Sequence, residues 1–204
     1  MHTAILAGGG ATRFDGRPKG LEVIGGGRIL DRLVDTCLAA FGELPLVVAN
    51  APEAAAWAPG LRVVPDLRPG LGALGGILTA IVAAPAPVIV VAWDMPFVTA
   101  ALLRALATRL DGADAALPAS GSRRGVEPLC AAYGPACGPA IERALAEGDQ
   151  RAIGFHAHVR VAVLGEAEVG AYGDPARLFF NVNTAADLDT ARQIAEATKD
   201  GHSG

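Results

Sequence analysis

The residues best suited to chemistry lie in a glycine-rich loop near the start of the chain. Gly8, Gly9 and Gly10 are consecutive, and glycine lets the backbone bring successive N–H groups close to an anion. Arg13 and Lys19 follow in the same loop, where they add a planar guanidinium and a compact ammonium, the two side-chain cations that bind phosphate. The loop therefore predicts a binding site for the phosphates of a ligand.

Two familiar phosphate-binding patterns do not describe this loop. A Walker loop ends in Gly-Lys followed by Ser or Thr, but here Pro18 precedes Lys19 and Gly20 follows it. A dinucleotide-binding loop has a third glycine where Arg13 stands and an acidic residue after the second strand, where this chain has Asn50. The sequence thus argues against an NAD-type dehydrogenase. An ordinary turn between a strand and a helix is the structural alternative, and the two cations argue against it.

Two aspartates come directly after apolar segments further along the chain. Asp94 follows the run 88–92, which is typical of a strand buried on both faces, and a carboxylate at the end of such a strand is well placed to bind Mg²⁺. The ion would neutralise phosphate oxygens during a reaction. Capping a helix is the alternative for Asp94, but Thr99 is a more natural cap. Asp66 follows the short run 62–64 and is either a turn residue or a second ligand contact.

Small and amide residues complete the set of candidates. Gly75 belongs to a glycine-rich segment at 71–76, which permits either the close approach of a flat ligand, such as a base, or the close packing of a helix on a sheet. Asn181 and Asn183 flank a valine near the C-terminus. Paired amides suit the edges of a ribose or a pterin, and the alternative that Asn183 starts the following helix stays open.

An α/β fold must position these residues, because short apolar runs alternate with helical patterns along the chain. We predict a single three-layer, doubly wound, Rossmann-like domain with a mostly parallel sheet over residues 1–198, followed by a frayed tail at 199–204. Ligands bind such sheets at the carboxyl ends of the strands, so the loops after Leu6, Ala49, Val64 and Ala92 should meet at one edge. The expected strands are 3–6, 46–49, 62–64, 88–92, 113–117, 129–133 and 158–164, and the expected helices are 29–41, 74–84, 139–147 and those capped by Thr99 and Thr184.

The composition predicts a folded, cytoplasmic protein. Of 204 residues, 51% are hydrophobic and 19% are charged, which suffices for a sizeable core. A net charge of −4 gives no basic surface for nucleic acid, and we expect neither a signal peptide nor a membrane-spanning segment. The three cysteines Cys37, Cys130 and Cys137 are odd in number and far apart, which predicts buried thiols in a reducing compartment.

The chain resembles a known superfamily in its opening loop. Leu6-Ala7-Gly8-Gly9, followed by Arg13 and Lys19, is similar to the signature loop of the sugar-phosphate and cofactor nucleotidyltransferases. Within that superfamily the chain resembles the molybdenum cofactor guanylyltransferases from Thr3 to about Ala195. The Asn-Val-Asn-Thr at 181–184 is what favours the guanylyl branch. The similar segments are 70–77, 94–96, 127–133, 147–151 and 180–184.

The resemblance implies a Rossmann-like fold that binds GTP and Mg²⁺. It also implies transfer of GMP to the terminal phosphate of molybdopterin-bound molybdenum, with release of pyrophosphate. By position, it assigns the guanine and ribose side of the loop to Leu6, Ala7 and Gly8, the phosphates to Lys19, further nucleotide contacts to Asp66 and to Asn50 or Ala49, the metal to Asp94, and the acceptor to Asn181 and Asn183.

The implied reaction is an in-line attack by a phosphate oxygen of the acceptor on the α-phosphorus of GTP. Because the attacking oxygen is already anionic, no general base is needed, and positioning and charge neutralisation supply the catalysis. We expect Arg13 and Lys19 to stabilise the developing charge, with Mg²⁺ on Asp94 bridging the two substrates.

Other functions are compatible with the same residues. Within the class, the alternatives are transfer of a cytidylyl group to the same cofactor and transfer of a nucleotidyl group to a sugar phosphate. From another class, an inactive nucleotide-binding carrier would keep the loop and deliver the cofactor to an apo-enzyme. We expect a monomer whose partners are GTP, the molybdopterin-type cofactor and, transiently, a molybdoenzyme apo-protein or its chaperone.

Overall fold

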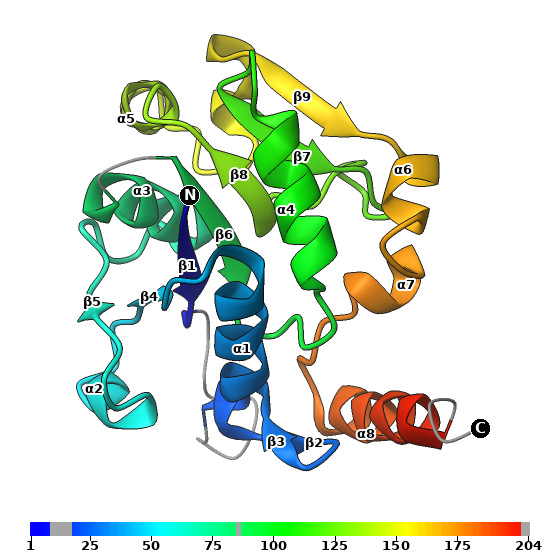
Figure 1. Ribbon diagram of the computed structural model, residues 1–204. Helices are drawn as coiled ribbons and strands as arrows, with labels where there is room; N and C mark the ends of the chain where they lie inside the picture. Colours follow the sequence, from blue (N-terminus) through cyan, green and yellow to red (C-terminus); the bar gives the residue numbers. More distant parts are fainter. Residues whose placement is uncertain (9–17, 85–86, 201–204) are drawn as a thin grey trace.

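A sheet of seven strands forms the centre of the molecule (Figure 1). The computed structural model describes residues 1–8, 18–84 and 87–200. The strands are β1 (His2–Leu6), β4 (Leu46–Val48), β5 (Val63–Val64), β6 (Val88–Ala92), β7 (Ala115–Pro118), β8 (Cys130–Tyr133) and β9 (Val161–Leu164). They stand in the order β5-β4-β1-β6-β8-β7-β9, with β8 antiparallel to both of its neighbours and the other pairs parallel. The predicted mostly parallel sheet is therefore confirmed.

Four parallel strands end together at one edge of the sheet. Leu6 at the end of β1 pairs with Ala92 at the end of β6 and with Val48 at the end of β4. Val48 in turn pairs with Val64 at the end of β5. The loops that follow these strands therefore meet at one edge, as predicted from the strand order of doubly wound sheets.

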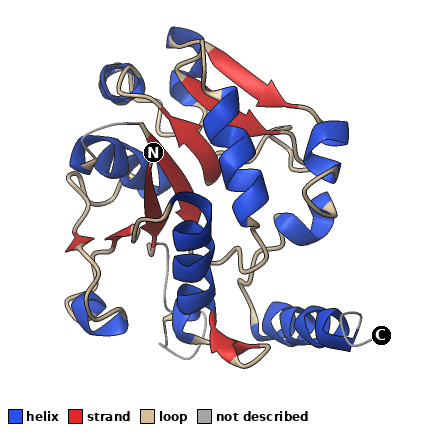
Figure 2. Ribbon diagram, viewed as in Figure 1, coloured by secondary structure: helices blue, strands red, loops and turns tan. Residues whose placement is uncertain are grey.

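Helices cover both faces of the sheet and complete the three layers (Figure 2). The helices α1 (Ile29–Phe41) and α4 (Ala100–Arg109) bury side chains together with Ile89 and Val91. The helices α3 (Gly72–Ala83) and α5 (Cys137–Ala146) bury theirs against the opposite face, with Val88 and Val90. Successive residues of a strand point to opposite faces, so the fully apolar β6 serves both cores at once.

The predicted helix at 29–41 is confirmed at both ends. Its buried residues Ile29, Leu33 and Cys37 recur every four positions, the spacing that lines one side of a helix. The helix ends at Gly42, whose φ is 72° and whose N–H donates to the carbonyl of Leu38 over 2.8 Å. A left-handed glycine of this kind terminates a helix without steric cost.

The last quarter of the chain forms three helices, α6 (Glu166–Gly170), α7 (Pro175–Leu178) and α8 (Ala185–Asp200). Both predicted threonine caps are confirmed: Thr99 Oγ1 accepts from Leu102 N (3.3 Å), and Thr184 Oγ1 accepts from Asp187 N (3.2 Å). The helix α8 lies apart from the sheet (Figure 1) and packs near the hairpin of β2 (Val23–Ile24) and β3 (Gly27–Arg28). The remaining short elements are η2 (Lys19–Leu21), α2 (Ala54–Trp57) and η3 (Gly154–His158).

The expected strand at 158–164 is wrong in its first part. His158 ends the short helix η3, and the strand begins only at Val161. The turn of η3 through His158 occupies the first residues of the expected strand. Just before β9, the Asp114 carboxylate accepts hydrogen bonds from the backbone N and the guanidinium of Arg160, at 2.9 to 3.1 Å. At the other end of the chain, α8 extends to Asp200, and residues 201–204 lie outside the described part.

The three cysteines are buried thiols, as predicted. Burial raises the pKa of Cys37 to about 11 and that of Cys137 to about 12, and it raises the pKa of Cys130 further still. Thiols with such a pKa stay protonated and unreactive at neutral pH.

Among the helices of the described residues, none combines the length and the apolar character that crossing a bilayer requires.

Candidate active site

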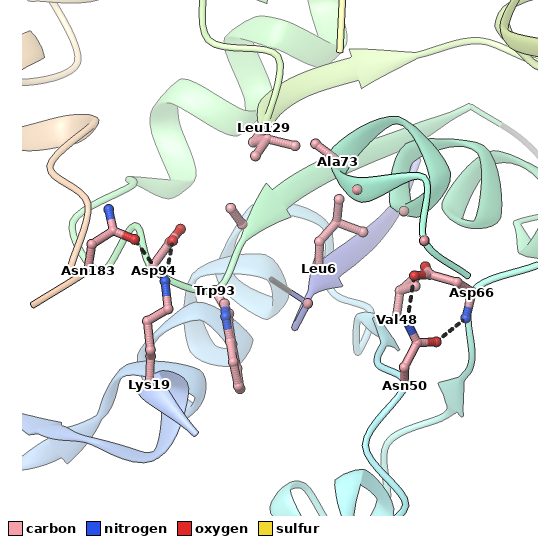
Figure 3. A pocket seen from close by; sticks show the side chains of 15 residues that line it. Leu6, Lys19, Val48, Asn50, Asp66, Ala73, Trp93, Asp94, Leu129 and Asn183 are labelled. Carbon is pink, nitrogen blue, oxygen red and sulfur yellow. Dashed lines mark hydrogen bonds and ion pairs between the residues drawn. The ribbon is translucent and has the colours of Figure 1, made fainter. Parts of the chain in front are cut away.

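A cavity of about 560 Å³ opens where the four parallel strands end (Figure 3). Its volume is in the range of pockets that hold a small-molecule ligand. Residues from the loops after β1, β4, β5 and β6 line it, together with the start of α3 and the residue before Thr184. The structure thereby brings together these predicted site residues: Leu6, Gly8, Lys19, Asn50, Asp66, Asp94 and Asn183.

One end of the cavity, which we call the charged end, consists of Lys19, Asp94 and Asn183 (Figure 3). Lys19 Nζ lies 3.2 Å from Asp94 Oδ2 and donates to Asn183 Oδ1 over 2.8 Å. The lysine side chain is 7% exposed and the aspartate side chain 18%. A buried ammonium requires such partners, because an unpaired charge away from water is costly. The contacts join three segments that lie 75 and 164 residues apart in the sequence.

The opposite end, which we call the amide end, consists of Asn50 and Asp66 from neighbouring loops (Figure 3). Asn50 Nδ2 donates to Asp66 Oδ2 over 2.7 Å, and Asp66 N donates to Asn50 Oδ1 over 2.8 Å. This reciprocal pair holds the carboxylate of Asp66 at the cavity mouth. Within the described part of the chain no donor takes Asp66 Oδ1, so that oxygen is free to accept from a ligand.

Trp93 and Leu6 lie between the two ends (Figure 3). Gly70, Gly72, Ala73 and Gly76, at and just before the start of α3, form a part of the lining that is poor in side chains. A Cβ on Gly76 would meet Leu6 Cδ1 at 3.1 Å, so the helix lies close to β1. The predicted contact of Gly75 is not supported, because Gly75 does not belong to the lining.

Gly75 packs against the segment that precedes its own helix, whereas the close approach of the helix to the sheet is at Gly76. A Cβ on Gly75 would lie 3.0 Å from Leu71 Cβ and 3.2 Å from the carbonyl oxygen of Arg68. Consecutive helical residues point about 100° apart, so a ligand in the cavity faces Gly76 and not its neighbour. The helix starts at Gly72 and not at residue 74 as predicted, and which of the adjacent glycines faces the cavity is set by its packing on β1.

The predicted asparagine pair is divided by the fold. Asn183 points its amide oxygen at Lys19, on the charged end. Asn181 does not line the cavity, and its Nδ2 donates to the carbonyl of Phe179 over 2.9 Å. Ala7 also faces away: its side chain is buried in the core, and its N–H donates to the carbonyl of Val48 over 2.8 Å.

Two further predicted residues, Gly9 and Arg13, lie outside the described residues.

The sequence analysis assigned no role to Glu127, which is 8% exposed. Burial raises the pKa of Glu127, its hydrogen bond from Leu129 N and the charge of Arg124 lower it, and the negative charge of Asp94 raises it. Glu127 is the first residue of the segment 127–133, one of the segments that resemble the family. Its position in that segment was the sequence signal that could have pointed to a second carboxyl group close to Asp94.

The geometry is that of an α/β protein with a ligand-sized cavity at the ends of parallel strands. A buried cation stands at one end of the cavity, and hydrogen-bonding side chains stand at the other. This division suits a nucleotide, with phosphates at the cation and the base at the uncharged amide and its partner.

Comparisons with known proteins agree with that class. Residues 3–161 match the family described as the MobA-like NTP transferase domain, and the chain belongs to this family. A probable molybdenum cofactor guanylyltransferase of Pelotomaculum thermopropionicum is 36% identical over 98% of this chain and 96% of its own length. A molybdenum cofactor guanylyltransferase of Desulfosudis oleivorans is 30% identical over 95% of both chains.

A solved structure agrees over nearly the whole fold. The crystal structure of molybdopterin-guanine dinucleotide biosynthesis protein A from Archaeoglobus fulgidus has a TM-score of 0.80 and 25% identity. The alignment covers 97% of this chain and 100% of that protein. The family and the fold expected from the motifs are therefore both confirmed.

Proposed function

We propose that this protein transfers GMP from GTP to molybdenum–molybdopterin and releases pyrophosphate. The family and the names of its full-length relatives support the reaction. The observation that carries the proposal is the charged end, where Lys19 lies between Asp94 and Asn183 at one side of a nucleotide-sized cavity. The triphosphate binds at this end, and the base lies toward Asn50 and Asp66.

The amide end favours guanine over cytosine. Guanine carries an exocyclic NH₂ donor next to a ring N–H donor, and a carboxylate accepts from both. Cytosine places acceptors beside its single NH₂ donor, and a carboxylate repels them. Asp66, oriented by its two hydrogen bonds to Asn50, is thus the residue that selects GTP.

The transfer needs charge neutralisation and alignment. A phosphate oxygen of the acceptor forms the bond to the α-phosphorus, and the bond from the α-phosphorus to the α,β-bridging oxygen breaks. The electron pair of that bond leaves with pyrophosphate. Lys19 stabilises the charge that develops on the α-phosphate and the leaving group, and it is already held in place by two hydrogen-bonding partners. The same role for Arg13 stays a prediction.

The donor set at the charged end fits Mg²⁺. The ion prefers oxygen ligands and is commonly bound by one or two carboxylates together with substrate phosphates. Asp94 offers such a carboxylate at the cavity. Among the described residues no group of three or more His, Cys, Asp or Glu forms a closed metal cage, so the nucleotide would supply the other ligands. When bound at Asp94, Mg²⁺ neutralises phosphate charge.

The acceptor approaches from the C-terminal side of the cavity. Asn183 closes that side of the charged end, and Asn181 lies two residues before it, where a side-chain rotation frees its amide from Phe179. We retain Asn181 as a contact of the pterin on that basis. The monomeric state, the cytoplasmic location and the transient contact with an apo-enzyme or chaperone stay predictions.

Turnover with defined substrates tests the proposal. Purified protein is mixed with molybdenum–molybdopterin, Mg²⁺ and GTP, CTP or ATP, and pyrophosphate and the dinucleotide product are measured. We expect product with GTP and little with CTP. Product with CTP alone indicates the cytidylyl alternative. Binding of GTP, seen as a rise in melting temperature, without any pyrophosphate indicates the inactive carrier.

A further inference from the structure

Two stacked tryptophans lie next to the charged end. Trp57 ends α2 and Trp93 follows β6, and they are the two tryptophans of the chain. Their ring centroids are 5.3 Å apart and their planes differ by 26°. Trp93 is 1% exposed and Trp57 6%. Among the described residues Trp93 Nε1 has no hydrogen-bond partner, so packing is what holds the indole there.

Gly20 rests on the indole of Trp93. A Cβ on Gly20 would lie 2.4 Å from Trp93 Cε3 and 3.0 Å from Cζ3. Trp57 is stacked on the same ring, which restricts how the indole can move away from Gly20. The approach of the η2 backbone to Trp93 therefore depends on the missing side chain at position 20.

The same indole adjoins both members of the buried ion pair. Gly20 directly follows Lys19, and Trp93 directly precedes Asp94. Trp93 N donates to the carbonyl of Leu6 over 3.1 Å, which anchors this residue to the end of β1. Lys19 Nζ and Asp94 Oδ2 meet at 3.2 Å, and Trp93 lies beside them (Figure 3).

We propose that Trp93 is a positioning residue that sets the distance between Lys19 and Asp94 through its contact with Gly20. The inference rests on the proposed function, in which Lys19 and Asp94 act on the triphosphate. Trp93 lines the cavity next to Asp94 but is only 1% exposed, so we assign its main effect on the reaction to these two neighbours.

The second ring of the stack is anchored from another element. Arg28 Nη1 donates to the carbonyl of Trp57, at the end of α2, over 2.9 Å. Ordinary core packing would give Trp93 a role in stability alone, without a specific coupling to Gly20.

A double-mutant cycle between Gly20 and Trp93 separates these two roles. Gly20→Ala adds a methyl group that must move Lys19 or the ring, and we expect kcat to fall about a hundredfold, the cost of a misplacement near 1 Å. Trp93→Leu removes Cε3 and Cζ3, and we expect kcat to fall about tenfold, with KM for GTP within about twofold. Activity is expressed per GTP-binding site, counted by equilibrium dialysis.

The kcat of the double variant distinguishes the positioning role from ordinary packing. If the two positions act independently, G20A/W93L loses about a thousandfold in kcat, the product of the single losses. We expect it to lose only about tenfold, because the added methyl group occupies the space that the indole vacates. A thousandfold loss, or normal kcat in either single variant, overturns the proposal.

A matched control and a spectroscopic reading complete the test. Phe155→Leu disrupts the other buried ring pair, Phe155 with Tyr133 at 6.0 Å, which does not line the cavity. It should lower the melting temperature and leave kcat per site unchanged. In a Trp57→Phe background Trp93 is the remaining tryptophan, and adding Gly20→Ala should shift its emission without any ligand. An unchanged spectrum contradicts the contact.

The controls also separate this inference from the function on which it rests. Lys19→Met and Asp94→Ala remove the two groups that Trp93 is proposed to position. If both keep full turnover, the proposed reaction site is wrong. If both lose turnover while Gly20→Ala keeps it, the positioning role of Trp93 alone is wrong.

Discussion

The two ends of the cavity are built in opposite ways. The charged end is partly buried, and it joins segments that are 75 and 164 residues apart. The amide end is exposed, and its two residues lie 16 positions apart in neighbouring loops. Electrostatic interactions weaken with exposure to water, so the same kind of contact does more where Lys19 meets Asp94.

The contrast between the two ends indicates where the reaction occurs and where the base of the nucleotide is selected. A buried cluster that depends on three distant segments forms only when the whole domain has folded, and it presents charge in a fixed geometry. A local pair at the mouth can change without disturbing the core. We therefore assign phosphate chemistry to the charged end and choice of base to the amide end, and four substitutions test that division.

The largest effect should come from Asp94→Ala. Loss of the carboxylate removes the proposed ligand of Mg²⁺ and the partner of Lys19, and we expect kcat to fall about a thousandfold. Pyrophosphate release at saturating GTP measures the change. Normal turnover of this variant at limiting Mg²⁺ would contradict the metal assignment.

Lys19→Met should rank second. Methionine keeps the length of the side chain and removes the ammonium that contacts Asp94 and Asn183, so we expect kcat/KM for GTP to fall about a hundredfold. Lys19→Arg should rescue little, because a planar guanidinium does not replace a compact ammonium in a buried site. Recovery by arginine would mean that charge alone suffices there.

Asp66→Ala should change selection and leave the chemical step nearly intact. We expect KM for GTP to rise about tenfold, the value of about 1.4 kcal/mol, while kcat stays within about twofold. Asn50→Ala should act in the same direction, and the two changes should be less than additive because each residue orients the other. Kinetics with GTP and CTP measure both effects. A large fall in kcat would contradict the assignment of base selection alone to the amide end.

Asn181→Ala should have the smallest effect. Its amide lies outside the cavity lining and bonds to its own backbone, so we expect KM for molybdenum–molybdopterin to rise only about threefold, by less than one hydrogen bond. KM for GTP should not change. The matched variant Asn183→Ala should affect both substrates, because Asn183 contacts Lys19. Equal effects of the two variants would support the prediction that Asn181 and Asn183 bind the acceptor as a pair.

Elements of the fold that have strong local causes could be predicted from the sequence. The helix at 29–41, the caps at Thr99 and Thr184, and the buried strand at 88–92 follow from periodicity and capping chemistry, and the structure has all of them. Four-residue helices such as α2 and α7 are too short to show a period. The missed packing of Gly20 on Trp93 has no local signal, because the two residues are distant in sequence.

The sequence by itself determined the kind of site: a glycine loop with two cations, an aspartate after a buried strand, and a family whose motifs run along the chain. Only the tertiary structure decided which candidates meet. It joined Asn183 to Lys19 and turned Asn181 away, and it placed Gly76 in the cavity instead of Gly75. The chain specifies the residue types, whereas the direction in which a side chain points depends on how its helix or strand packs against segments that are distant in sequence.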